Sequence, residues 1–183
     1  MLHLYNKHVR PGMVEREVQR IREAEAQVCD AYEEGFKYDA KLRQQAIEGK
    51  TIVRASDRPW ELSRQGRQKF YFHIVFDDMA VRNWRLFVHD IRSHSGRHRH
   101  QGGLAIYVIE GRGWTIVDGQ RLDWEKEDLI LLPIKPGGVE HQHFNAAPGK
   151  PCRWLGMVFS PFKEVLGSEL EQKAVSPEWA EHA

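Results

Sequence analysis

Two stretches of the sequence decide the fold: residues 94–103 read HSGRHRHQGG, and residues 136–145 read PGGVEHQHFN. Five of the ten histidines of the chain lie in these two segments. In an extended strand, side chains two residues apart share one face at a spacing of about 7 Å, so His98 and His100 can point to the same side. His141, beyond a Pro/Gly turn, can supply a third imidazole from a strand distant in sequence. The pattern predicts a site for one divalent metal ion.

The sequence around these segments predicts an all-β body. From Thr51 onward, short runs rich in Val, Ile, Phe, Tyr and Trp are separated by Gly, Pro, Asp and Asn, which is typical of antiparallel strands and turns. Asp118-Gly119 is a hairpin signal. The predicted strands are residues 70–76, 84–91, 104–111, 113–119, 128–134, 141–144 and 152–159.

The first 50 residues have a helical pattern instead. Apolar residues recur at steps of three, four or seven among Glu and Arg, which predicts an amphipathic helix that Gly35 breaks. A second helix is expected over 39–48, ending at Gly49. This arm is expected to cover the barrel or a partner subunit without chemistry of its own. The apolar positions are Val14, Val18, Ile21, Val28 and Tyr32.

The C-terminal region turns polar after Pro161, and residues 163–172 predict a short helix before a frayed end. The expected division is therefore an N-terminal helical arm over 1–50, a barrel over 51–165, and a tail with a short helix over 166–183.

Composition describes an ordinary globular chain of one domain, with 41% hydrophobic and 29% charged residues among 183. A net charge of +1 gives no general attraction to nucleic acid or an anionic membrane. Cys29 and Cys152 lie far apart without CxxC spacing, which argues against a disulfide framework and favours a reducing cytoplasm. No apolar run approaches the roughly 18 residues of a membrane span, and the N-terminus has no signal-like apolar region. We expect a cytoplasmic protein.

The two histidine segments resemble the two conserved blocks of the cupin superfamily. Gly96, His98 and His100, followed by IYVIEGRG over 106–113, match the first block, which has the form G, HxH, Glu, Gly. The second block, PxGxxHxxxN, is matched at every fixed position by Pro136, Gly138, His141 and Asn145. The resemblance covers about residues 80–160. It implies a double-stranded β-helix, which is a jelly-roll barrel, with His98, His100 and His141 as metal ligands.

One position departs from the common cupin pattern: Leu104 stands where most cupins carry a glutamate ligand. An HRH core without that glutamate is similar to gentisate-type ring-cleaving dioxygenases and to β-diketone and dihydroxyacetophenone dioxygenases. Those families bind ferrous iron with three histidines, so the resemblance implies Fe(II). Three imidazoles also accept Zn, Ni, Mn or Cu.

Three neutral ligands leave the full +2 charge on the ion, which favours an anionic, chelating substrate beside dioxygen. The first hypothesis is a non-haem Fe(II) dioxygenase that cleaves a C–C bond in a small aromatic, phenolic or diketone-like substrate. The second is a lyase, isomerase or hydrolase that uses the metal as a Lewis acid. The third is a non-catalytic cupin that binds a small molecule. No GxSxG, P-loop or dinucleotide motif supports another class.

The two motifs say less about the residues that surround the three candidate ligands. Gln101, Leu104, Ile106 and His143 are candidates for the substrate pocket or for support of the ligands. His94 is expected in a loop, and His73 and His89 are treated as ordinary core or surface residues. Four arginines can receive a substrate carboxylate, although each is expected to be a solvated surface residue. They are Arg85, Arg97, Arg99 and Arg112. The apolar strand surface and the arm predict a homodimer or larger homo-oligomer.

Overall fold

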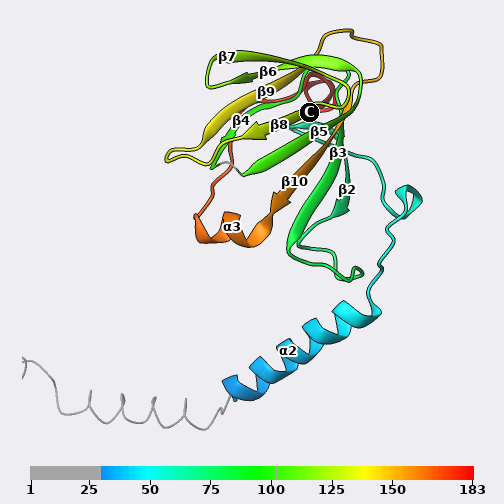
Figure 1. The fold of residues 1–183 in the computed structure, drawn as a ribbon, viewed down its shortest axis with the longest axis vertical. Helices are drawn as coiled ribbons and strands as arrows, with labels where there is room; N and C mark the ends of the chain where they lie inside the picture. The colour runs from blue at the N-terminus through cyan, green and yellow to red at the C-terminus, as the bar shows by residue number, and fades with distance from the viewer. Residues whose placement is uncertain (1–29, 102) are drawn as a thin grey trace, which may run out of the picture. The chain divides into compact units, whose positions relative to one another are not determined.

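The structure is a computed structural model that describes residues 30–101 and 103–183 of the chain (Figure 1). Within them, antiparallel strands form two sheets, one in the order β1-β2-β3-β10-β5-β8 and the other in the order β11-β4-β9-β6-β7. The predicted all-β jelly-roll barrel is confirmed. The strands are β1 (Glu61–Ser63), β2 (Gly66–Phe72), β3 (Trp84–Asp90), β4 (Arg97–His100), β5 (Leu104–Glu110), β6 (Arg112–Val117), β7 (Gln120–Glu125), β8 (Leu129–Leu132), β9 (Val139–Asn145), β10 (Arg153–Phe159) and β11 (Glu171–Ala174).

Most predicted strands are confirmed to within two residues at each end, and the strand through His141 extends two residues further back and one further on. The predicted hairpin is also present, since Asp118 and Gly119 both have positive φ, at 48° and 87°. The strand expected over 70–76 is wrong in its bounds. Its second half is a turn, because the N–H of Phe76 donates to the carbonyl of His73 and closes the chain on itself.

The helix α2 (Ala31–Glu48) begins at Asp30, whose carboxylate accepts hydrogen bonds from the N–H groups of Tyr32 and Glu33. Its end before Gly49 agrees with the prediction. The predicted break at Gly35 is wrong, since a single glycine costs a helix only about 1 kcal/mol relative to alanine. The predicted helical positions from Val14 to Val28 lie outside the described residues.

The C-terminal region differs from the prediction. Helix α3 (Ser160–Val165) starts with Pro161 in its first turn and stops before Gly167, which has a φ of 55°. The helix predicted over 163–172 is therefore wrong in its second half, where β11 pairs with β4. Two short elements complete the chain, the 3-10 helix η1 (Ala55–Asp57) and α4 (Pro177–Ala180). The described residues include no helix long and apolar enough to cross a membrane.

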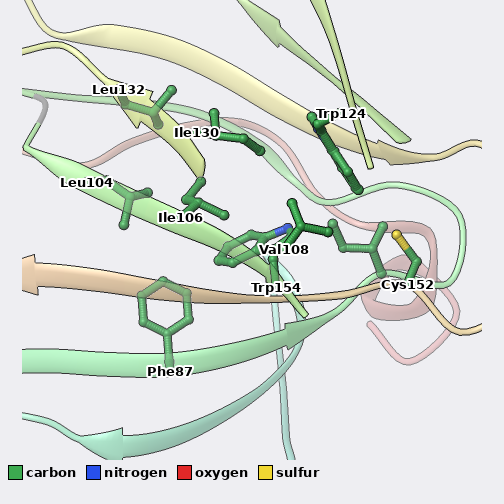
Figure 2. Packing of buried hydrophobic residues seen from close by; sticks show 10 residues of the cluster. Phe87, Leu104, Ile106, Val108, Trp124, Ile130, Leu132, Cys152 and Trp154 are labelled. Carbon is green, nitrogen blue, oxygen red and sulfur yellow. The ribbon is translucent and has the colours of Figure 1, made fainter. Parts of the chain in front are cut away.

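The hydrophobic core lines the inner face of the six-stranded sheet (Figure 2). Leu104, Ile106 and Val108 of β5 point into it beside Trp154 of β10, and Trp124 joins it from β7 of the other sheet. The five-stranded sheet contributes mainly polar side chains to the interior. The buried side chains of β4, β9 and β6 include His98, His141, His143, Thr115 and Asn145. The barrel interior therefore has one mainly apolar wall and one wall that carries the histidines of β4 and β9.

Candidate metal centre

Three histidines come together on the inner face of β4 and β9. The register of the two strands places His98 directly opposite His141, and His100 follows two residues along β4. The ring centroids of His98 and His141 are 4.2 Å apart, and those of His100 and His141 are 4.9 Å apart. One ligand nitrogen from each residue lies within 4.8 Å of the others. The antiparallel pairing thus assembles the trio that the sequence predicted; its role as ligand set stays a prediction.

The backbone holds each of these rings in the same way, with its Nδ1 near a carbonyl oxygen. A carbonyl only accepts hydrogen bonds, so Nδ1 carries the proton and Nε2 keeps its lone pair. The Nε2 of His141 is buried and has no hydrogen-bond partner among the described residues, as expected of an atom that is available to bind a metal ion. The donor set therefore fits a divalent ion held by three imidazoles. The acceptors for His98, His100 and His141 are the carbonyls of Gly96, Gln101 and Val139, each 3.2 Å away.

Burial keeps these imidazoles neutral. It lowers the pKa of His98 to about 4, with a further contribution from His100. It also lowers the pKa of His141 well below the ordinary value for histidine, and the neighbouring histidines act in the same direction. Neutral imidazole is the form that binds metal, so no proton has to be displaced from either ring at neutral pH.

A cavity of about 200 Å³ lies over the histidines. An apolar cavity of roughly 150 Å³ admits one benzene ring, so this space suits a single substituted ring. Its described lining is mainly apolar and contains no Asp or Glu. The apolar part is formed by Phe70, Phe87, Leu104, Trp154, Val158 and Leu170.

Two cations face the same cavity. Arg85 and Lys163 both line it, and neither has an ion-pair partner among the described residues. The Nε of Arg85 is buried and has no hydrogen-bond partner in the part of the chain that the structure describes. The expectation that Arg85 is a solvated surface residue is therefore wrong. The sequence analysis did not identify Lys163 as a cavity residue. A usable signal for Arg85 is its position on the strand, since it lies two and four residues before Phe87 and His89 and so shares their inward face.

The other predicted pocket residues divide into two groups. Gln101, Leu104 and His143 line the cavity. Ile106 is fully buried in the hydrophobic core instead and does not line it. His94 lies outside the cavity, where its ring packs against Phe144.

His89 is a lining residue that sequence reasoning missed. It is fully buried beside Trp154, and burial lowers its pKa to about 3, with a smaller contribution from His98.

His143 has a defined hydrogen-bond environment. The indole N–H of Trp124 donates to the hydroxyl oxygen of Thr115 at 2.9 Å, and that hydroxyl lies 2.8 Å from Nδ1 of His143. The arrangement leaves the threonine proton free to bond to Nδ1, which favours the tautomer with the proton on Nε2. This Nε2 is buried without a hydrogen-bond partner among residues 30–101 and 103–183, and His143 lines the cavity. His143 can therefore present a neutral N–H to a bound molecule.

Comparison with protein families supports the assignment of the fold. Residues 88–158, which hold all three histidines, match the family model of the cupin domain. This part of the chain is similar to a cupin domain, and the two antiparallel sheets form a barrel with the jelly-roll fold of cupins.

The matches to individual proteins cover only part of this chain, and some cover only part of the other protein. A gentisate 1,2-dioxygenase of Streptomyces sp. is 39% identical over 59 residues, which is 32% of this chain and 15% of that protein. Salicylate 1,2-dioxygenase of Pseudoaminobacter salicylatoxidans, solved with gentisate, aligns with a TM-score of 0.50 at 16% identity over 74% of this chain and 35% of its own. The polyketide cyclase RemF of Streptomyces resistomycificus aligns with a TM-score of 0.50 at 17% identity, over 70% and 88%. The structural likenesses show the fold alone, and the chain spans much less than two thirds of either dioxygenase.

Proposed function

We propose that the chain is a non-haem Fe(II) dioxygenase that cleaves a C–C bond of a small anionic aromatic, phenolic or diketone-like substrate. The observation that carries the proposal is the convergence of three neutral imidazoles on one cavity that has unpaired cations and no described carboxylate. The local similarity of 59 residues to a gentisate dioxygenase supports the same reaction class.

His98, His100 and His141 would hold the iron. When bound, this ion supplies Lewis acidity toward the substrate oxygens and an electron source for dioxygen. Since the three imidazoles are neutral, they cancel none of the positive charge that attracts an anionic substrate. The backbone carbonyls on their Nδ1 atoms fix the rings before anything binds, so little reorganisation is needed.

The cavity walls would orient the substrate. Phe87 and Leu104 supply an apolar surface for a ring. Arg85 and Lys163 would hold its negative group, because a half-buried guanidinium without a carboxylate partner is stabilised by an anionic ligand. The Nε2–H of His143 would donate a hydrogen bond to a substrate oxygen. The apolar lining would exclude water from the reacting groups.

The test is anaerobic reconstitution of the protein with ferrous iron, followed by oxygen-uptake screening of hydroxybenzoates, catechols, hydroxyacetophenones and β-diketones. The proposal predicts oxygen uptake that depends on one of these compounds and on iron. Conversion of a compound without oxygen uptake would favour the Lewis-acid lyase or isomerase. Binding without conversion would favour the non-catalytic cupin. The homodimer and the cytoplasmic location remain predictions.

A further inference from the structure

Two cations lie together where β3 and β10 meet α3. Arg85 of β3 lies opposite Val158 of β10. The pairing continues beyond the strands, since the N–H of Ser160 donates a hydrogen bond to the carbonyl of Asn83 at 2.8 Å. Helix α3 begins at Ser160, and Lys163 in its last turn reaches the same cavity as Arg85. The ends of the two strands therefore bring an arginine and a lysine to one part of the cavity wall.

These two cations affect each other and one of the candidate metal ligands. Burial lowers the pKa of Lys163, and the charge of Arg85 lowers it further. Burial also lowers the pKa of His100, and the charges of Lys163 and Arg85 act in the same direction. The described lining of the cavity has no carboxylate to balance the pair. Two half-buried like charges without a counter-ion are unfavourable, so the arrangement favours an anionic ligand.

The cation pair and the candidate metal ligands lie on opposite walls of the cavity. His98, His100 and His141 belong to β4 and β9 of the five-stranded sheet. Arg85 belongs to β3 of the six-stranded sheet, and α3 directly follows β10 of that sheet (Figure 1). Two packed sheets are about 10 Å apart. A ligand that contacts both walls must therefore carry its anionic group away from the atoms that bind the metal.

The wall that carries the cations also has an apolar surface for a ring. Phe87 lies two residues after Arg85 on the inward face of β3, and Gly156 lies opposite Phe87 on β10. A Cβ at Gly156 would come within 2.8 Å of the Phe87 ring, so the glycine leaves room for that ring on the wall. Leu104 lies on the same wall (Figure 2). An aromatic ligand can therefore pack beside the cations while it reaches toward the histidines.

We propose that the ligand of this site is a carboxylic acid whose carboxylate is remote from the two oxygens that chelate the metal. Arg85 and Lys163 hold the carboxylate, and the ion on the three histidines holds a pair of hydroxyl or keto oxygens at the other end of the molecule. The inference rests on the proposed function and names its substrate class. In 3,4-dihydroxybenzoate the carboxylate is remote from the catechol oxygens, whereas in 2,3-dihydroxybenzoate it is next to them. The two isomers have the same composition and charge, so only the position of the carboxylate distinguishes them.

The test uses these two isomers and catechol as probes of the full chain, loaded with zinc and kept free of oxygen. Calorimetric titration measures the three dissociation constants, and metal analysis measures the zinc content. The wild type should bind 3,4-dihydroxybenzoate about tenfold to a hundredfold more tightly than either other probe, which is the contribution of a charged hydrogen bond. Zinc has no redox chemistry, so the measurement reports binding and not turnover.

A variant of the lysine separates the carboxylate site from the metal. Lys163→Met should weaken the binding of 3,4-dihydroxybenzoate about tenfold and change the affinity for catechol by less than about twofold, because catechol has no carboxylate. Lys126→Met is the matched control, since Lys126 is 64% exposed and lies outside the cavity. It removes the same charge and should change none of the three affinities. Unchanged circular dichroism and zinc content would show that both variants are folded.

Equal or tighter binding of 2,3-dihydroxybenzoate by the wild type would overturn the inference. A loss of catechol affinity in Lys163→Met as large as the loss for 3,4-dihydroxybenzoate would also overturn it. If all three probes bind the zinc-loaded protein with equal affinity, the inference fails and the proposed function stands. If the zinc-loaded protein binds none of them, the proposed function fails as well.

Discussion

At the scale of single residues, the Nδ1 contacts of His98, His100 and His141 with backbone carbonyls leave the Nε2 lone pair of each ring available to bind a metal ion. We expect alanine at any of the three to remove most of the bound iron, since two imidazoles hold a divalent ion much less tightly than three. The measurement is iron per chain after anaerobic reconstitution and desalting. His94→Ala is the control and should retain the wild-type content, because His94 lies outside the cavity. Wild-type iron content in His141→Ala would contradict the assignment.

Arg85 was expected on the surface, and the structure shows that it lines the cavity. Arg85→Met should weaken binding of an anionic ligand such as a hydroxybenzoate by about tenfold to a hundredfold, the value of one charged hydrogen bond of roughly 1.5–3 kcal/mol. Calorimetric titration of the metal-loaded protein measures this effect. Arg85→Lys should recover part of the affinity, and both variants should keep full iron content. Equal affinity in wild type and Arg85→Met would show that the arginine does not hold the anion.

Leu104 lines the cavity beside the histidines and is 5% exposed. Leu104→Glu should still bind metal, because it adds a carboxylate of the kind that most cupins have at this position. The same carboxylate removes one unit of positive charge, so we expect weaker binding of an anionic chelating substrate and slower oxygen-dependent turnover. Leu104→Gln is the isosteric control without charge. Full turnover in Leu104→Glu would show that the reaction does not rely on three neutral ligands.

At the scale of elements, the strands of the barrel could be predicted because their apolar residues alternate and glycines mark their ends. The short polar strand β11 could not, since its EQKA sequence has no apolar alternation and its place is set by backbone pairing with β4. The same limit applies to Gly35, where helix formers on both sides outweigh one glycine. The three candidate ligands could be predicted because they lie within the two motifs. Lys163 could not, since it lies on α3, outside both motifs, and only the fold brings it to the cavity.

The turn before β9 offers a test of what Gly138, the fixed glycine of the second histidine block, does for the metal centre. Gly137 and Gly138 both have positive φ, at 76° and 78°, so alanine strains the backbone at either position. Only at Gly138 would the new Cβ meet backbone atoms, the carbonyl carbon and oxygen of His100 at 2.8 Å. Gly138→Ala should therefore destabilise the protein by about 1–3 kcal/mol more than Gly137→Ala in chemical denaturation. It should also lower the affinity for iron, since His100 must shift; equal effects of the two substitutions would contradict this explanation.

At the scale of the whole molecule, the two sheets have separate tasks. The six-stranded sheet supplies most of the apolar core on its inner face, and the five-stranded sheet supplies the three candidate ligand histidines. This division lets one barrel combine a mainly apolar wall with a polar site, which is the arrangement that small-molecule cavities generally have. The reaction class then depends on what the histidines, Arg85 and Lys163 bind together.

The most direct test of the central claim is turnover of a substrate, found by the oxygen-uptake screen, under isotopically labelled dioxygen with the ferrous protein. Mass spectrometry of the product measures how many labelled oxygen atoms it gains. A dioxygenase that cleaves a C–C bond places both atoms of one dioxygen molecule in the product, and alanine at His141 should abolish this incorporation. A product that forms at the full rate without dioxygen, or that carries no label, would contradict the proposed function and show that the three histidines serve Lewis-acid chemistry instead.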